Sequence, residues 1–281
     1  MSGFSPNWLA LREQADHRSR APHLAFKIAE KLAGFVNVRI VDLGCGTGSN
    51  LRALAPILSN DQYWHLVDYS EDLLAHARIL LREWADYAET TTEGMTLYFD
   101  EKIIHVRFSN VDLKHGISGL LTPRPDLVTS SAFFDLISAD WIQTMAADIA
   151  RQNILFHTVL SYDGRIQWFP THNLDQAVQD AFNQDQQSDK GFGPASGPDS
   201  TSILVEAFEK KGYLCETADT PWIIHRNDEP ELLDALGTGI GEAVIAKLPM
   251  PAMQEWTSAL EQRRSVLIGH RDLYACPPDE L

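Results

Sequence analysis

A glycine-rich segment near the start of the chain, residues 41–50 with the sequence VDLGCGTGSN, constrains the fold more than any other feature. It follows a β-branched run at residues 38–43 and precedes a helical pattern at residues 49–58, so we expect a strand, a tight turn and a helix. The three glycines let the main chain approach a ligand closely and adopt dihedral angles that a Cβ atom would forbid. The helix start behind them offers unpaired amide donors, which suits a carboxylate or a phosphate.

Two acids flank this turn. Asp42 ends the first strand, where a carboxylate does not suit a pyrophosphate but suits an ammonium group, directly or through water. Asp68 follows Gly48 by twenty residues and ends the second expected strand, which covers residues 64–67. An acid at that strand end can accept hydrogen bonds from both hydroxyls of a ribose. Together these features predict a nucleoside-binding crevice.

Strand and helix patterns alternate through the first 160 residues, and strands separated by helices of this length are parallel. The fold class we predict is α/β, with a twisted, mostly parallel seven-stranded sheet and helices on both faces. Further strands are expected at residues 102–108, 126–130, 154–160, within 213–226 and at 265–275. Helices are expected at residues 7–34 with a break near Pro22, at 70–84 capped by Ser70, at 135–150, at 174–187, from 199 or 200 to 212, and at 230–264.

A dinucleotide-binding dehydrogenase is the sharpest rival interpretation of the turn. The dehydrogenase fingerprint spaces its glycines as G-x-G-x-x-G, whereas this chain has G-x-G-x-G. A third small residue would have to stand at Leu51, where a leucine would crowd the helix against the strand. The spacing therefore disfavours a nicotinamide cofactor.

The segments VDLGCGTG and HLVDYS resemble those of the class I S-adenosylmethionine-dependent methyltransferases, which have a Rossmann-like fold. The resemblance extends along most of the sheet. It implies S-adenosyl-L-methionine as the cofactor, with the glycine turn under its methionine part and Asp68 on its ribose. Around the turn and the second strand, the residues implied for cofactor binding are Asp42, Gly44, Cys45, Gly46, Gly48, Asn50, Asp68 and Tyr69.

The same resemblance implies roles for residues outside the turn. Asp112 matches the position that holds the adenine amino group, and Val111 and Leu113 match positions that pack on the ring. Ser130 and Ser131, which end the fourth strand, match the segment that passes the cofactor's sulfur. Upstream of the first strand, Arg20 matches a basic residue that reaches the cofactor carboxylate in some relatives, and Arg18 is the competing choice.

Methyl transfer is an in-line displacement, so the protein mainly aligns the acceptor with the methyl group and excludes water. A base is needed only when the acceptor carries a proton that it does not lose easily. His172 and Asp135 are the leading candidates for that role. The sequence contains no metal-binding arrangement that we can assign and no N/D-P-P-Y/F motif, which disfavours methylation of adenine in nucleic acids. We therefore expect a small-molecule acceptor.

The organisation we expect is a single methyltransferase domain over residues 1–281. It comprises an N-terminal helical segment (1–36), a cofactor-binding core (37–170) and a substrate-side half (171–281). The Gly/Pro-rich loop 189–198 has the composition of a mobile cover, and Phe192 supplies an apolar tip. The segment 230–264 reads as a helical insertion that acts as a cap or a homodimer surface. We expect a break at residues 249–251 and a further interruption near its three close glycines.

The net charge of −16 argues against nucleic-acid partners and anionic membrane surfaces, because no basic face is evident. Three widely spaced cysteines indicate no disulfide framework, and the sequence shows no leader or apolar span, so we expect a cytoplasmic protein. Two alternatives to a methyltransferase remain at this point. They are a non-catalytic S-adenosylmethionine-binding regulator and a nicotinamide-dependent dehydrogenase.

Overall fold

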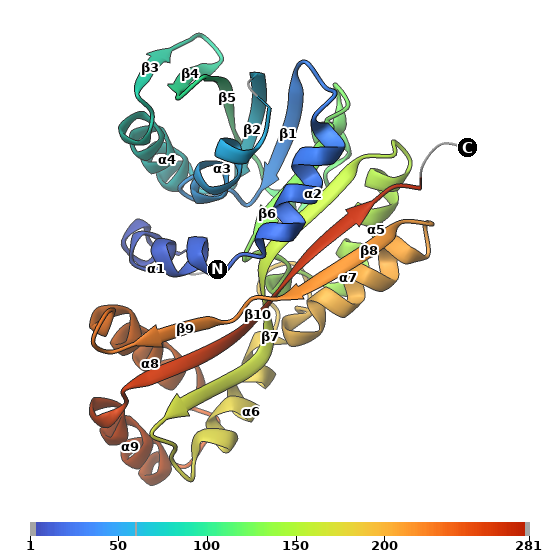
Figure 1. Cartoon of the computed structure of the whole chain (residues 1–281). Coiled ribbons are helices and arrows are strands. Elements are labelled where there is room, and N and C mark those ends of the chain that lie inside the picture. Colours follow the sequence, from blue (N-terminus) through green and yellow to red (C-terminus); the bar gives the residue numbers. More distant parts are fainter. Residues whose placement is uncertain (1–3, 60, 279–281) are drawn as a thin grey trace.

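The computed structural model describes residues 4–59 and 61–278, and a twisted mixed sheet runs through the whole of it (Figure 1). Its strand order is β3-β4-β5-β2-β1-β6-β7-β10-β8, with β9 beside β10. The five central strands run parallel: β5 (Lys102–Asn110), β2 (Asp61–Asp68), β1 (Val38–Leu43), β6 (Leu127–Ser131) and β7 (Leu155–Phe169). The predicted parallel centre is thus confirmed.

The sheet has ten strands in the described residues, so the prediction of seven was wrong. The additional strands are antiparallel: β3 (Tyr87–Thr90) and β4 (Gly94–Phe99) extend one edge beyond β5, and β9 (Trp222–His225) accompanies β8 (Leu214–Asp219) beside β10 (Ser265–Cys276). β3 and β9 are only four residues long, so an alternation of polar and apolar residues is too short to be recognised in the sequence.

Helices cover the two faces of the sheet. α2 (Pro22–Leu32), α3 (Ser49–Leu54) and α4 (Glu71–Trp84) pack on one face, and α5 (Ala139–Ala150) and α7 (Ser200–Glu209) pack on the other. Three more helices, α6 (Asp175–Gln186), α8 (Pro230–Val244) and α9 (Met250–Ala259), gather around the far halves of β7 and β10 (Figure 1). No helix among residues 4–59 and 61–278 is long and apolar enough to cross a membrane.

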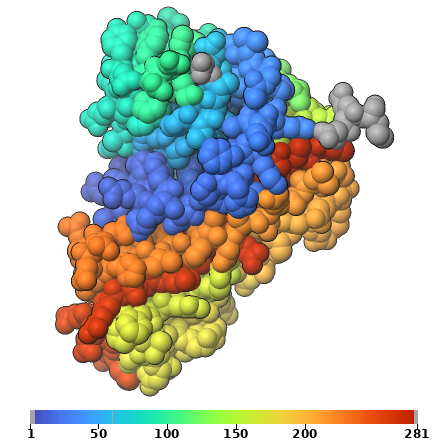
Figure 2. Space-filling view, in the orientation of Figure 1, coloured from blue at the N-terminus to red at the C-terminus, as the bar shows by residue number. Residues whose placement is uncertain are grey.

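The N-terminal segment forms two helices, α1 (Pro6–Arg18) and α2, with the break before Pro22 that the sequence predicts. Figure 2 shows this segment, in dark blue, between the cyan and green part that contains β2 to β5 and the orange and red part that contains β9 and β10. α1 therefore lies where the two halves of the molecule meet. Its contacts with β9 and α8 support this placement.

The predicted interruption of the helix near its three glycines was wrong, because α8 continues through all of them to Val244. The helix does break before Met250, where α9 begins, next to the break predicted at residues 249–251. Two of these glycines serve packing. A Cβ on Gly237 would lie 2.9 Å from Leu260 Cδ2, and one on Gly241 would lie 3.5 Å from Trp256. The missing side chains let the chain around α9 approach α8 closely, and that packing offsets the low helix propensity of glycine.

Candidate functional site

The glycine turn after β1 has the left-handed geometry that its sequence predicts. Gly44, Gly46 and Gly48 have φ of 65°, 53° and 78°. A Cβ on Gly44 would lie 2.7 Å from Phe133 Cδ2, so a side chain there would be both strained and crowded. The turn therefore requires glycine, and Phe133 closes over it.

Three main-chain amides of this turn, which precede the helix start, donate hydrogen bonds within the protein. The amide of Cys45 donates to Val67 O (3.0 Å), that of Gly46 to Asp68 Oδ2 (2.9 Å) and that of Gly48 to Cys45 O (2.9 Å). The first two bonds fasten the turn to the end of β2 and the third lies within the turn, so these three amides are not free to donate to a ligand. The contribution of the turn is close main-chain approach rather than a set of free amides.

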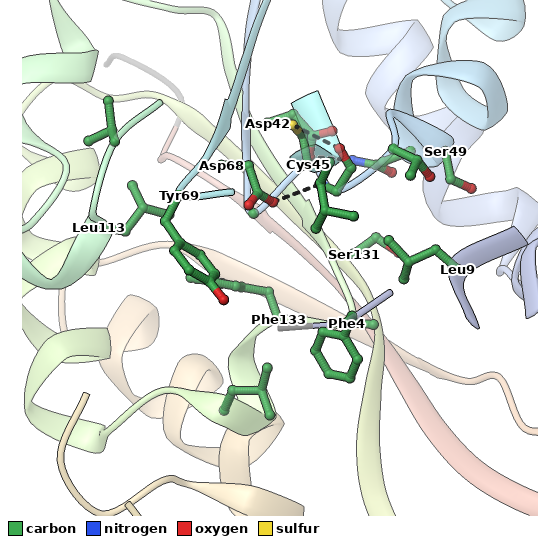
Figure 3. Close-up of a pocket in the computed structure, with 18 of the residues that line it drawn as sticks. Phe4, Leu9, Asp42, Cys45, Ser49, Asp68, Tyr69, Leu113, Ser131 and Phe133 are labelled. Atoms are coloured by element: carbon green, nitrogen blue, oxygen red, sulfur yellow. Dashed lines mark hydrogen bonds between the residues drawn. The ribbon is translucent and has the colours of Figure 1, made fainter. Parts of the chain in front are cut away.

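A cavity of about 300 Å³ opens beside the turn, at the carboxyl ends of β1, β2, β5 and β6 (Figure 3). This is the crevice where open parallel sheets bind ligands. Eleven of the residues expected to bind cofactor line it: Asp42, Gly44, Cys45, Gly46, Asn50, Asp68, Tyr69, Val111, Asp112, Leu113 and Ser131.

Asp42 is fully buried at the base of this cavity. Its Oδ1 accepts a hydrogen bond from Asn50 Nδ2 at 2.9 Å, whereas its Oδ2 is buried without a partner in the described residues. Burial raises the pKa of Asp42 to about 7. A buried carboxylate oxygen that faces a cavity and lacks a donor fits a cationic ligand group, held directly or through water.

Asp68 ends the neighbouring strand and braces the turn from the opposite side. Its Oδ2 accepts from Gly46 N and its Oδ1 from Ser70 N, both at 2.9 Å. Burial raises its pKa. Each carboxylate oxygen accepts up to two hydrogen bonds, so both retain capacity for ligand hydroxyls.

The residues after β2 and β5 form one side wall of the cavity (Figure 3). Tyr69 is half exposed and lies near the buried Leu113. Asp112 uses one oxygen, Oδ1, to accept from Lys114 N at 3.1 Å and so caps a short 3₁₀ turn. Its other oxygen is available to a ligand. This wall is mostly apolar and carries one carboxylate.

Three residues expected to bind cofactor do not line the cavity: Arg20, Gly48 and Ser130. Ser130 Oγ donates to Leu43 O at 2.8 Å, which ties β6 to β1. Gly48 faces Leu81, so its role is packing of α3 against α4. Arg20 Nη1 donates to Asn50 Oδ1 at 2.7 Å and thus supports Asp42 from behind.

α1 supplies the wall that the sequence analysis missed. Leu9, Arg12 and Asp16, spaced at helical intervals, face the cavity, and Phe4 lies at its rim. His17 Nε2 contacts Ser49 Oγ (2.9 Å), which holds α1 against the start of α3. The spacing of residues 9, 12 and 16 places them on one face of a helix, but the sequence does not indicate what that face packs against.

The guanidinium-bearing side chain that lines the cavity belongs to Arg12. Its Nε and Nη2 donate to Asp16 at 2.9 and 3.2 Å, and it stacks over Trp222 at 5.0 Å from the ring centroid. Nη1 is not used in that ion pair. Arg12 and Lys114 are the cations among the described residues that line the cavity, against four carboxylates: Asp16, Asp42, Asp68 and Asp112.

The remaining wall of the cavity is apolar and includes the tip of the Gly/Pro-rich loop. Phe192 packs edge-on against Phe133 and Trp141, with ring centroids 6.1 and 5.9 Å away, and both phenylalanines line the cavity. Lys190 Nζ pairs with Asp185 at 2.8 Å, which anchors the loop to α6. Phe192 is therefore placed at the cavity as the sequence suggested.

The two candidate bases lie in different places. Asp135 is adjacent in sequence to Leu136 of the cavity wall, its Oδ1 is buried without a partner in the described residues, and burial raises its pKa to about 6. His172 instead lines a separate depression with Trp168 and Asp175. The structure does not bring His172 to the cavity. β7 continues nine residues past the expected end at residue 160, which carries the following chain roughly 30 Å further along the strand.

No metal site is evident in residues 4–59 and 61–278, where no group of three or more His, Cys, Asp or Glu side chains could hold an ion.

No protein-family model matches the chain, and no curated protein matches its sequence. Solved structures match over nearly the whole chain. A cyclopropane-fatty-acyl-phospholipid synthase-like protein from Lactobacillus casei has a TM-score of 0.52 at 14% identity, covering 96% of this chain and 94% of that one. A Bacillus halodurans protein provisionally named a methyltransferase has a TM-score of 0.50 at 14% identity, covering 92% and 100%. A methyltransferase from Geobacter sulfurreducens, in complex with S-adenosyl-L-homocysteine, has a TM-score of 0.49 at 14% identity, covering 98% and 99%. At these identities the similarity concerns the fold.

Proposed function

We propose that this chain, which has the fold of the class I S-adenosylmethionine-dependent methyltransferases, transfers a methyl group from S-adenosyl-L-methionine to a small, largely apolar acceptor. The observation that carries the proposal is the pair of carboxylates, Asp42 and Asp68, at the ends of adjacent parallel strands on either side of the glycine turn. Asp42 Oδ2 is buried and has no hydrogen-bond partner in the part of the chain that the structure describes.

The charge of the cavity favours this cofactor over a dinucleotide. S-adenosylmethionine carries an ammonium and a sulfonium, whereas NAD carries a diphosphate. Four carboxylates and two cations line the cavity, so its net field attracts positive groups. Three amides of the turn, those of Cys45, Gly46 and Gly48, donate within the protein and are not available to a phosphate.

Each part of the cofactor has a partner in this proposal. Asp42 Oδ2 holds the ammonium, Asp68 accepts from the ribose hydroxyls, and the free oxygen of Asp112 accepts from the adenine amino group. Tyr69, Val111 and Leu113 pack on the adenine ring. When bound, the cofactor supplies a methyl group made electrophilic by the positive charge on its sulfur.

We assign the cofactor carboxylate to Arg12 in place of Arg20. Arg12 lines the cavity with Nη1 outside its ion pair, while Arg20 lies behind Asn50. Asp16 and the Trp222 ring fix the orientation of the Arg12 guanidinium, which reduces the entropy lost on binding.

The acceptor occupies the apolar end, between Phe133, Phe192 and Leu136 in this proposal. Side chains of this kind bind a flat or aliphatic body and exclude water from the transfer. Phe192 sits on the loop 189–198, so the same loop covers the acceptor. Asp135, beside this wall, takes the proton of an acceptor that carries one.

Transfer from isotopically labelled S-adenosylmethionine tests the proposal. The protein is incubated with small phenols, carboxylic acids and amines, and products are detected by mass spectrometry. We expect label in one acceptor class, and less label with Asp68→Ala when the cofactor concentration is below saturation. Tight binding of S-adenosylhomocysteine without transfer to any acceptor, including cell extract, would instead leave a non-catalytic binding protein.

A further inference from the structure

A second cavity, of about 310 Å³, lies nearer the amino ends of the same strands and, among the described residues, shares no lining residue with the cofactor cavity. Its floor is formed by β1, β2, β5 and β4. Its walls are the loop around Pro123 and Pro125 and the β3–β4 hairpin turn at Thr91 and Glu93. This volume suits a small ligand.

The cavity exists because one face of the sheet is only partly covered. The connection from β5 to β6 contains two 3₁₀ turns, Leu113–His115 and Ser118–Leu121, and no α-helix. Its leucines cover Val41 and Val67 near the carboxyl ends of the strands. The amino ends of the same strands keep an open face, on which Tyr63 is 43% exposed.

The strand register sets two rows of side chains on this face. Arg39, Tyr63, His105 and Thr96 are directly paired across β1, β2, β5 and β4, and Val41, His65, Arg107 and Gly94 form the next row. Residues two apart on a strand face the same side, so both rows point into the cavity. The Cα atoms of Arg39 and Arg107 are therefore about 12 Å apart on the diagonal, within the combined reach of two arginine side chains.

Both guanidiniums lack a carboxylate partner among the described residues. Arg107 Nη2 donates to His65 Nδ1 at 2.8 Å, and His65 Nε2 in turn contacts Ser109 Oγ at 2.7 Å. The Arg39 side chain forms no hydrogen bond in the part of the chain that the structure describes, although its main-chain amide donates to Asp126 Oδ2 at 2.8 Å. In a chain of net charge −16, two arginines in one cavity with no carboxylate partner among the described residues form a local positive region.

An aromatic surface adjoins these cations. The Tyr63 and His105 rings are stacked, with centroids 4.6 Å apart and an interplanar angle of 26°. His65 stays neutral because burial and the Arg107 charge lower its pKa to about 4. Among the described residues that line the cavity, the titratable groups are Arg39, Arg107, His65, His105, Tyr63 and Glu93, which lies at the hairpin rim.

We propose that this cavity binds a small planar molecule carrying a phosphate, with the phosphate between Arg39 and Arg107 and the ring against Tyr63. Guanidiniums bind phosphate oxygens in a bidentate fashion, and an exposed aromatic side chain supplies a stacking surface. Glu93 precedes Gly94, which is paired with Arg107, so its carboxylate lies on the β4 side of the cavity, where it suits a hydroxyl or amino substituent of the ligand.

Calorimetric titration with phenyl phosphate tests this site. We expect saturable binding with a dissociation constant of about 1 mM or tighter, and weaker binding of inorganic phosphate, which lacks the ring. Arg39→Gln should weaken phenyl phosphate binding about tenfold or more. Tyr63→Leu should reduce its affinity to that of inorganic phosphate. Arg271→Gln, which changes an exposed arginine on β10, should have no effect.

Two results would overturn the site. One is an equal affinity in Arg39→Gln and the unmodified protein, or no saturable binding at all. The other is loss of phenyl phosphate binding when S-adenosylhomocysteine is present, because that would place the anion in the cofactor cavity. Since Arg39 makes no side-chain hydrogen bond in the described residues, its replacement should leave the melting temperature unchanged, and this separates loss of binding from loss of folding.

Discussion

Asp68 Oδ2 accepts a hydrogen bond from the main-chain amide of Gly46 at 2.9 Å, which joins the end of β2 to the turn after β1. One carboxylate thus shapes the glycine turn and faces the cavity beside it. Because Asp68 has both roles, its replacement should lower both the stability of the fold and the affinity for the cofactor.

Asp68→Ala should weaken binding of S-adenosylhomocysteine by roughly 1–3 kcal/mol, the usual loss when a charged hydrogen-bond partner is removed. It should also lower the melting temperature, because the amides of Gly46 and Ser70 lose their acceptors. Titration calorimetry and thermal unfolding measure the two effects. Asp61→Ala, at the opposite end of the same strand, serves as the control and should bind normally. Unchanged affinity in Asp68→Ala would remove Asp68 from the site.

Asp42→Asn should stabilise the protein at pH 8 while weakening cofactor binding. Burial raises the pKa of Asp42 to about 7 in the folded state, against about 4 in an unfolded chain. The folded state therefore holds the proton longer, and stability falls as the pH rises from about 4 to 7. Asparagine does not ionise, so urea unfolding should show a gain of about 1–4 kcal/mol at pH 8 and little change at pH 4. A variant less stable than the parent at both pH 8 and pH 4 would show that burial of the charged Asp42 does not destabilise the fold.

Gly46→Val should abolish cofactor binding. Gly46 has a φ of 53°, which valine rarely adopts. A Cβ there would also lie 3.1 Å from Leu9 Cδ1, so valine would strain the turn and push α1 away. Gly34→Val is the matched control, because nothing lies within 4 Å of a Cβ there. Retained calorimetric binding in Gly46→Val, with normal binding by the control, would show that close main-chain approach is unnecessary.

Asp135→Asn should lower kcat about a hundredfold for acceptors that must lose a proton and leave S-adenosylhomocysteine binding unchanged. The pKa of Asp135 is raised by burial to about 6, so the rate of the parent enzyme should fall as the pH drops below about 6, where the carboxylate becomes protonated. The variant should lack that decline. A parent profile flat through this range, with equal kcat in the variant, would exclude Asp135 as the proton acceptor.

The parallel core was predictable because each of its strands carries a β-branched or apolar run bounded by turn signals. The turn, Asp42 and Asp68 could also be placed, since their spacing is local and parallel strands bring their carboxyl ends together. Ser70 caps α4 as predicted, with its Oγ accepting from Leu73 N at 3.3 Å.

The rest depended on long-range packing. β7 extends to Phe169 through polar residues whose strand character comes from pairing with β10, so the position of His172 could not be inferred. Arg12 lies about thirty residues before the turn, and only the docking of α1 on α3 brings it to the cavity. Ser130 was assigned to the cofactor by its place in the sequence, but the pleat turns its side chain toward Leu43 O.

The most direct test of the account is calorimetric titration of the unmodified protein with S-adenosylhomocysteine and, separately, with NAD. We expect one saturable site for S-adenosylhomocysteine, lost in Gly46→Val, and no binding of NAD. Binding of NAD without binding of S-adenosylhomocysteine would contradict the assignment of the cavity between Asp42 and Asp68.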